Sequence, residues 1–184
     1  MSALAWGVGS ALAIVGLVLA VVWRRSRETG AALAERSSRP AALRDAELVY
    51  LERAFRISKP VGLVAKLDRA YRMPSGLIVL MEFKTRRLNQ PSRSDVIQVS
   101  AQRLAVMGQT RQVVATHAYV MVKTPTRPAL PTAHRVELMS GDQVVALIRR
   151  RDDLLAGRVL PRWPLSRRTC DTCSFRVRCS SFPL

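Results

Sequence analysis

Apolar and polar positions divide this chain into one long apolar run at the N-terminus and a longer region of short, mixed segments. The run from Ala3 to Trp23 holds no charged residue, and at about 1.5 Å per helical residue it can cross a hydrocarbon core of about 30 Å. A cleaved signal peptide would begin with a basic segment, but no Lys or Arg precedes this run. The run therefore predicts a transmembrane helix rather than a signal peptide or a buried core helix. Arg24, Arg25 and Arg27 follow directly, which predicts a cytoplasmic C-terminal domain at the inner membrane.

The remaining chain divides by composition into a short linker and one domain. Residues 26–41 are small, polar and Arg-bearing, which predicts a juxtamembrane linker or a frayed helix. Residues 42–184 are enough for a single domain with a hydrophobic core. The predicted organisation is therefore a membrane anchor over 1–25, which contacts the lipid bilayer through 3–23, a linker over 26–41 and a folded domain over 42–184.

A β-hairpin is predicted where the segments LDRAY and LIVLMEFK flank a turn. Both segments are rich in strand-forming residues, and the Pro74–Gly76 stretch between them has turn chemistry. If these three residues form the loop, Met73 lies opposite Leu77. Counting outward from that pair places Asp68 directly opposite Glu82, so that two carboxylates face each other across neighbouring strands.

Opposed carboxylates suggest a cation site. Like charges directly opposite one another destabilise a sheet unless a positive charge lies between them, and carboxylate oxygens are ligands that Mg²⁺ prefers. Lys84 shares the face of Glu82 because side chains alternate along a strand. Such a set could promote phosphodiester hydrolysis, and the alternative is a strand face of solvated charges. The opposite face is predicted to be apolar, made of Leu67, Tyr71, Val79, Met81 and Phe83.

The other periodic segments complete an α/β pattern. Ser94 is a candidate N-cap for a helix over 95–107 that ends at Gly108. On that helix Gln98 and Gln102 lie one turn apart and therefore on one face. The remaining predicted elements are a strand or helix end over 48–57, a central strand over 113–122, a short strand over 135–139 and a helix over 141–156 that begins after Ser140.

Four segments carry a family resemblance in this order: GLVAKLDRAY, MEFKTRR, SDVIQVSAQ and CDTCSFRVRC. Together they resemble the PD-(D/E)XK nuclease superfamily, in particular its RecB-like and CRISPR-associated exonuclease branch. The resemblance implies a restriction-endonuclease-like α/β core, a mixed and mainly antiparallel sheet flanked by helices. Matched residue by residue, it implies Asp68, Glu82, Lys84 and Gln98 as the catalytic residues, with Mg²⁺ or Mn²⁺ held by Asp68 and Glu82.

This chain departs from the family pattern at two positions. The family usually has Tyr one helical turn after its Gln, whereas Gln102 stands here. Many members carry a metal-binding His upstream of the Asp, whereas the histidines of this chain are His117 and His134. Either Glu47 or Glu52 could replace that His as the third metal ligand, because other branches use Glu; Glu52 is our choice.

Three cysteines near the C-terminus, Cys170, Cys173 and Cys179, have the spacing C-x2-C-x5-C. In a reducing cytoplasm this spacing favours a metal site over a disulfide. It resembles the C-terminal clasp of iron–sulfur members of the same family, in which a fourth Cys completes the ligand set. No fourth Cys is present in this chain, which leaves an iron–sulfur cluster with another ligand, a zinc site or a vestigial motif.

The formal net charge of +17 favours a polyanionic partner, either nucleic acid or anionic lipid. The function expected from the sequence is that of a membrane-anchored, Mg²⁺- or Mn²⁺-dependent DNA nuclease of exonuclease type. The alternative is a membrane-tethered nucleic-acid-binding or assembly protein that keeps the nuclease fold without turnover.

Overall fold

The computed structural model describes Leu33 and residues 35–125, 130–162, 164, 167–171 and 173–179. Its strands and helices are β1 (Glu47–Ile57), β2 (Leu63–Arg72), β3 (Ile78–Thr85), α2 (Arg93–Thr110), β4 (Val114–Lys123), β5 (Thr132–Glu137), α3 (Gly141–Leu155) and α4 (Arg167–Asp171). Two 3-10 turns, η1 (Ala41–Leu43) and η2 (Arg176–Arg178), complete the set. The transmembrane helix predicted over residues 3–23 lies outside the described residues. Within them, every helix is too short or too polar to cross a membrane.

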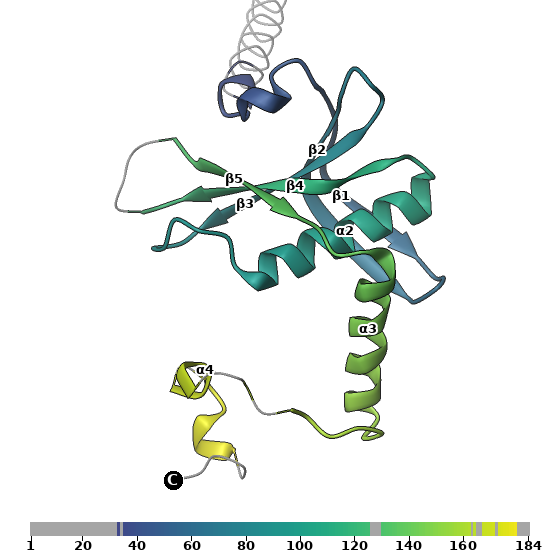
Figure 1. Cartoon of the computed structure of the whole chain (residues 1–184), viewed down its shortest axis with the longest axis vertical. Coiled ribbons are helices and arrows are strands. Elements are labelled where there is room, and N and C mark those ends of the chain that lie inside the picture. The colour runs from purple at the N-terminus through teal and green to yellow at the C-terminus, as the bar shows by residue number, and fades with distance from the viewer. Residues whose placement is uncertain are drawn as a thin grey trace, which may run out of the picture.

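The five strands form one mixed sheet in the order β1-β2-β3-β4-β5. β3 and β4 are parallel, and the other neighbouring pairs are antiparallel. A parallel pair needs a crossover connection, and α2 supplies it between β3 and β4. In Figure 1, α2 lies across one face of the sheet and η1 lies over the opposite face. The predicted α/β fold, a mixed and mainly antiparallel sheet flanked by helices, is confirmed.

Apolar side chains bury both faces of the sheet. On the α2 face, Val99 and Val106 of the helix pack with Leu80 of β3. On the opposite face, Leu43 of η1 packs with Tyr71 of β2. Further members of the second cluster are Val79 and Met81, with Phe83 partly buried against it. These residues lie on the apolar face that the sequence predicts for them.

Leu67 departs from that prediction, because it belongs to the α2-side cluster and not to the cluster of Tyr71. Ala70, three residues along β2, belongs to the α2-side cluster as well. In a regular strand, residues three positions apart point to opposite faces, so the alternation of β2 shifts by one position between Leu67 and Ala70. Asp68 lies in this irregular stretch.

The boundaries of α2 differ from the predicted ones. Ser92, not Ser94, is the N-cap: its hydroxyl accepts the backbone N–H of Asp95, whose carboxylate accepts the backbone N–H of Ser92 at 2.7 Å. This reciprocal pair is a capping box. Gly108 does not end the helix, which continues for two more residues. A Cβ at Gly108 would come within 2.7 Å of the Ile57 side chain, so its glycine permits close packing on β1.

The other boundaries agree closely with the pattern. β1 matches the strand predicted over 48–57, and α3 begins after Ser140, whose side chain forms a capping box with Gln143. Gly157, with a φ of 68°, follows the end of α3. β5 begins at Thr132, earlier than the strand predicted over 135–139, because it pairs with the whole second half of β4.

The described part of the predicted linker is packed against the sheet rather than extended from it. Glu35 accepts a hydrogen bond from the Tyr71 hydroxyl at 2.5 Å and a two-oxygen contact from Arg39 at 2.6–3.1 Å. Burial alone would raise the pKa of Glu35, but these hydrogen bonds hold it below its ordinary value. Burial and Glu35 together raise the pKa of Tyr71 to about 12.

Candidate active site

The hairpin between β2 and β3 has the predicted three-residue loop. The backbone N–H of Met73 donates to the carbonyl of Leu77 at 2.9 Å, which closes the hairpin. Gly76 has a φ of 84°, in the left-handed region where glycine is free of steric strain. The loop length therefore sets the register on which the predicted site depends.

The β2–β3 ladder opens at the candidate site. Paired residues continue outward to Arg69 and Met81, and one further step along each strand reaches Asp68 and Glu82. At this point the Asp68 side chain takes a place between the strands, because its Oδ2 accepts the backbone N–H of Phe83 at 2.7 Å. Asp68 and Glu82 therefore lie one position beyond the last residue pair, Arg69 with Met81, and their direct pairing stays a prediction.

Glu82 is buried and is surrounded by hydrogen-bond donors. Its side chain is about 3 % exposed. Oε1 accepts hydrogen bonds from Lys84 Nζ and Gln98 Nε2, each at 2.6 Å, and Oε2 accepts one from Gln102 Nε2 at 2.8 Å. Lys84 Nζ also donates to Gln98 Oε1 at 2.8 Å. The structure therefore brings three predicted catalytic residues, Glu82, Lys84 and Gln98, into direct contact.

Gln102 received no role from the sequence, although it touches the same carboxylate. It is 2 % exposed, whereas Gln98 lies at the solvent-facing edge of the site. A sequence signal for it exists, because the one-turn spacing from Gln98 places both amides on one face of α2. What the sequence lacks is the direction of that face, which α2 takes only by packing on the sheet.

The environment of Asp68 disfavours a negative charge. Burial raises the pKa of the Asp68 carboxyl, and the nearby carboxylates of Glu82 and Glu52 raise it further. The N–H of Phe83 and the Lys84 ammonium oppose this rise. A bound cation would offset the same repulsion, so the electrostatics of the site suit a divalent metal.

The structure separates the two candidates for a third carboxylate. Glu52 lies opposite Asp68, because its neighbours in β1 pair with the neighbours of Asp68 in β2. It has a φ of 47°, unusual for a residue with a side chain, and it forms an exposed ion pair with Lys66 at 2.5 Å. Glu47 lies at the far end of the strand opposite Arg72, which contacts it at 3.4 Å. Glu52 is thus the candidate near Asp68.

The donor set fits Mg²⁺ or Mn²⁺ rather than a metal that needs a full protein cage. In the part of the chain that the structure describes, no three or more His, Cys, Asp or Glu side chains converge on one point. Mg²⁺ is commonly held by one or two carboxylates, with water and phosphate oxygens completing its shell. Asp68 and Glu82 meet that requirement, and they could hold such an ion.

Comparison with known proteins identifies the family. A family model described as the PD-(D/E)XK nuclease superfamily matches residues 7–180. This chain belongs to the PD-(D/E)XK nuclease superfamily. Its members are usually metal-dependent nucleases that use Mg²⁺ or Mn²⁺. The superfamily resemblance is thereby confirmed, while the RecB-like and CRISPR-associated branch stays a prediction.

Two further comparisons add little to this family assignment. A solved structure titled "Crystal structure of SSO0001" is similar at 17% sequence identity with a TM-score of 0.46, covering 90% of this chain and 75% of that chain. Among curated proteins, nothing matches.

The three cysteines of this superfamily member line one hollow, but they do not make a metal-binding group among the described residues. The backbone N–H of Cys173 donates to the carbonyl of Cys170 at 3.1 Å, and Cys173 and Cys179 are exposed. Figure 1 shows α4 and η2 apart from the sheet, and Phe175 is 69 % exposed. The described C-terminal residues therefore lie apart from the sheet.

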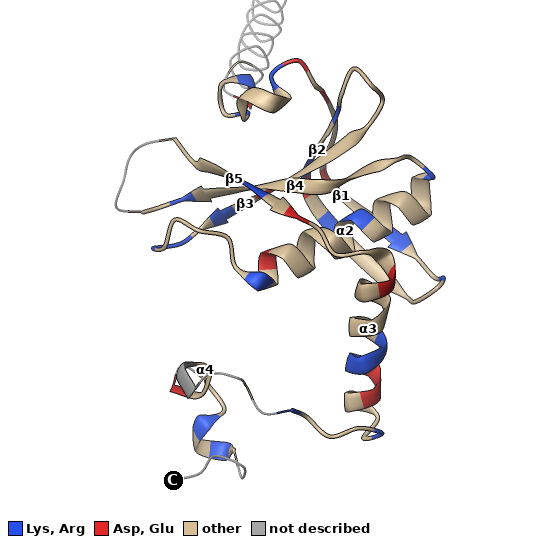
Figure 2. Ribbon diagram, viewed as in Figure 1, with Lys and Arg blue, Asp and Glu red and all other residues tan. Residues whose placement is uncertain are grey.

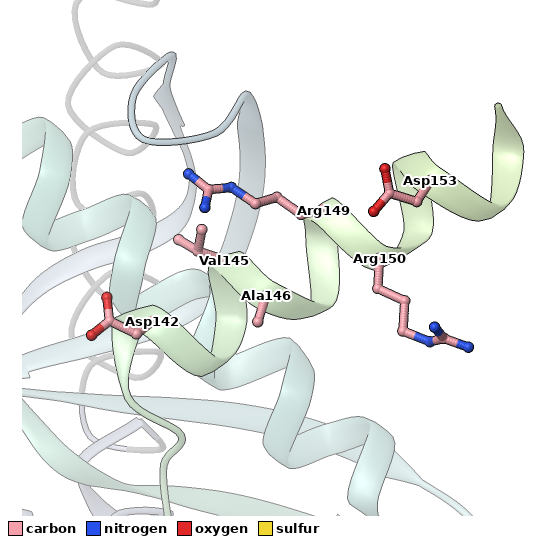
Figure 3. A pocket seen from close by; sticks show the side chains of 6 residues that line it. All are labelled: Asp142, Val145, Ala146, Arg149, Arg150 and Asp153. Atoms are coloured by element: carbon pink, nitrogen blue, oxygen red, sulfur yellow. The ribbon is translucent and has the colours of Figure 1, made fainter. Parts of the chain in front are cut away.

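Another hollow follows the exposed side of α3 and is separate from the candidate site. Figure 3 shows its lining side chains, all from α3, with Arg149 and Arg150 pointing in different directions. Asp142 and Asp153 add two negative charges to the positive charges of these arginines. The hollow contains none of the residues around Glu82, so the candidate chemistry lies at the sheet and not on α3.

Proposed function

We propose that this chain is a metal-dependent DNA nuclease of exonuclease type. The observation that carries the proposal is the position of Asp68 and Glu82 one residue beyond the last pair of the β2–β3 ladder, where Asp68 accepts the N–H of Phe83 and Lys84 is bonded to Glu82. Asp68 and Glu82 would hold Mg²⁺ or Mn²⁺, and Glu52 would become the third carboxylate by exchanging its ion pair with Lys66 for the metal, since the three carboxylates do not converge in the described structure. When bound, the ion would polarise the scissile phosphate and lower the pKa of an attacking water.

The chain's own residues would bind and orient the reacting groups. Lys84 has a side chain that is 24% exposed, so its ammonium can reach both the buried Glu82 carboxylate and a phosphate at the surface. That charge would orient the attacking water or offset negative charge that builds on the phosphate. Gln98 holds Lys84 and Glu82 together through its two amide atoms.

DNA is the proposed substrate because of the charge of the chain and the position of basic residues beside the site. The net charge is +17, Arg87 is exposed on the segment that joins β3 to α2, and Arg93 is exposed at the start of α2. Figure 2 shows basic residues at the end of β3 and at the start of α2. Basic side chains next to the two carboxylates would contact the phosphates that flank the scissile bond.

A membrane anchor over residues 3–23 is part of the proposal, with the C-terminal domain in the cytoplasm at the inner membrane. The support is the uncharged apolar run and the arginines that follow it. Glu35 contacts Tyr71 on the face of the sheet opposite α2. A bilayer on that side would leave the α2 side, where Gln98 and Gln102 reach Glu82, open to DNA.

The cysteines are proposed to hold zinc or an iron–sulfur cluster, supported by their spacing and by the single hollow that they line. Metal analysis of the anaerobically purified full-length protein tests this point. Iron or zinc should be present in the wild type and absent from Cys173→Ala, with a matching loss of thermal stability. Wild-type protein that carries neither metal would identify the motif as a remnant.

The rival function is nucleic-acid binding without cleavage. It is favoured by one observation: both oxygens of Glu82 already accept hydrogen bonds from side chains of this chain. Incubation of the full-length protein with linear and with closed circular DNA, in Mg²⁺, Mn²⁺ or EDTA, separates the alternatives. Metal-dependent loss of linear DNA alone supports an exonuclease, and loss of both forms supports an endonuclease. Retention of DNA without cleavage supports the rival.

A further inference from the structure

Gln102 occupies a position that connects the two strands of the candidate site. It lies on α2, and its Nε2 donates to the backbone carbonyl of Lys66 in β2 at 3.0 Å and to Glu82 Oε2 in β3 at 2.8 Å. Lys66 is two residues from Asp68 in the same strand. One buried amide therefore ties both strands together just beyond Arg69 and Met81, where their ladder ends.

The orientation of the Gln102 amide follows from its partners. A backbone carbonyl accepts hydrogen bonds and never donates them, so the nitrogen and not the oxygen must face Lys66. Both hydrogens of the amide are then in use, one on each strand. The amide oxygen, Oε1, is buried and has no hydrogen-bond partner among the described residues.

An unsatisfied buried oxygen costs free energy that an apolar side chain of similar shape would avoid. Methionine would fill the same space without the unpaired amide oxygen, but it would leave Glu82 Oε2 and the Lys66 carbonyl without their donor. The presence of Gln at a position that favours an apolar residue points to a use for its donors. The two N–H groups of the Gln102 amide join β2 to β3 and bind the Glu82 carboxylate.

We infer that Gln102 is a positioning residue of the active site: it holds the Glu82 carboxylate and sets the separation of β2 and β3 on which the Asp68–Glu82 pair depends. The inference rests on the proposed function, since it concerns the residues that would hold the metal. Gln98 and Gln102 bind different oxygens of Glu82. Gln98 shares Oε1 of Glu82 with Lys84 at the exposed edge, and Gln102 fixes Oε2 from the buried side.

Gln102→Met in the full-length protein tests the inference, with Ser100→Ala as the matched control. Ser100 is equally buried on α2 and accepts the backbone N–H of Met139 at 3.0 Å, away from Glu82. Residues behind metal ligands typically change metal affinity or activity by about 10–100-fold. We expect a loss in this range for Gln102→Met, both in Mn²⁺ binding without DNA and in DNA cleavage. Thermal unfolding without metal should show that both variants are folded. Gln102→Met should be less stable than the wild type, because Glu82 Oε2 and the Lys66 carbonyl lose their donor, and Ser100→Ala should bind metal as the wild type does.

The outcomes separate this inference from the proposed function. If the wild type binds no Mn²⁺ and cleaves no DNA, the proposed function fails and the positioning role fails with it. If the wild type is active and Gln102→Met binds Mn²⁺ and cleaves DNA equally well, the positioning role alone is overturned. An equal loss in Gln102→Met and Ser100→Ala would also overturn it, because the effect would then reflect the packing of α2.

Discussion

The backbone N–H of Phe83 donates a hydrogen bond to the Asp68 carboxylate across 2.7 Å, just beyond the last paired residues of the β2–β3 ladder. The Asp68 side chain therefore makes a hydrogen bond between β2 and β3 of the kind that backbone carbonyls make elsewhere in the hairpin. The contact fixes one oxygen of Asp68 against β3, on the strand that carries Glu82.

Asp68→Asn should abolish cleavage and stabilise the metal-free protein near neutral pH. Burial raises the pKa of Asp68 above its ordinary value of 3.8, and Glu82 and Glu52 add to the rise. A carboxyl with a raised folded-state pKa stabilises the fold below its ordinary pKa and loses that contribution as pH rises through the folded value. Asparagine cannot ionise, so it avoids this loss while it still accepts the N–H of Phe83.

Thermal unfolding in EDTA checks this prediction, at acidic and at neutral pH. The variant should exceed the wild type in stability at neutral pH, and the difference should shrink on acidification. Cleavage should fall by at least about 100-fold, beyond the range typical of residues behind a ligand. Cleavage by Asp68→Asn at the wild-type rate would show that Asp68 holds no essential metal.

Lys84→Met should remove cleavage while it preserves the fold and metal binding. The Lys84 ammonium contacts Glu82 and Gln98, but Glu82 retains its hydrogen bonds from the two glutamines when the ammonium is absent. Loss of the charge that stabilises the transition state should lower the cleavage rate by about 100-fold or more. The matched control is Lys123→Met, since Lys123 is an exposed residue at the end of β4. Equal cleavage by both variants would remove Lys84 from the proposed site.

Asp95→Asn should destabilise the domain at neutral pH but not at strongly acidic pH. Burial would raise the pKa of Asp95, but hydrogen bonds from Arg86 and Ser92 hold it below its ordinary value of 3.8. A carboxyl with a lowered pKa stabilises the fold above its ordinary pKa, and this stability is lost as pH falls through the folded value. We expect a cost of about 1.5–3 kcal/mol at neutral pH, typical of a hydrogen bond to a charged group.

Urea unfolding at neutral and at acidic pH measures this cost. The matched control is Asp142→Asn, since Asp142 lies in the first turn of α3 with an exposed side chain. That control should change the free energy of unfolding by less than Asp95→Asn. A cost for Asp95→Asn that does not change with pH would assign the effect to packing instead of charge.

The apolar run over residues 3–23 should retain the full-length protein in membrane fractions after a carbonate wash. A reporter that is active only in the cytoplasm, fused after Leu184, should be active, because the arginines beyond Trp23 favour the cytoplasmic side. Removal of residues 1–25 should release the protein from the membrane fraction. Digestion of the C-terminal domain by protease added outside intact spheroplasts would show that the domain lies on the opposite side of the membrane from the predicted one.

Local chemistry in the sequence was sufficient to predict the hairpin and its register. A turn of Pro74 to Gly76 closes over a short distance, so the loop length sets the pairs from Arg72 with Ile78 to Arg69 with Met81 and brings Asp68 and Glu82 to the position just beyond them. The one-turn spacing of Gln98 and Gln102 and the cap of α3 at Ser140 depend on local geometry in the same way. The mixed sheet was predicted from the family resemblance, and the hairpin and the helix of Gln98 are among the segments that carry that resemblance.

Tertiary packing decided what local pattern could not. The β1–β2 register placed Glu52, and not Glu47, beside Asp68, because the two strands pair along their whole length and Glu47 lies at the far end, opposite Arg72. Contact with Ile57 of β1 explained Gly108 within a continuing helix, whereas the capping box of Ser92 and Asp95 is a local signal that the sequence prediction of Ser94 missed. Gln102 acquired its role only when α2 packed its buried face on β2 and β3. Alternation and propensity describe single strands and helices, whereas an active site is a set of distances between several of them.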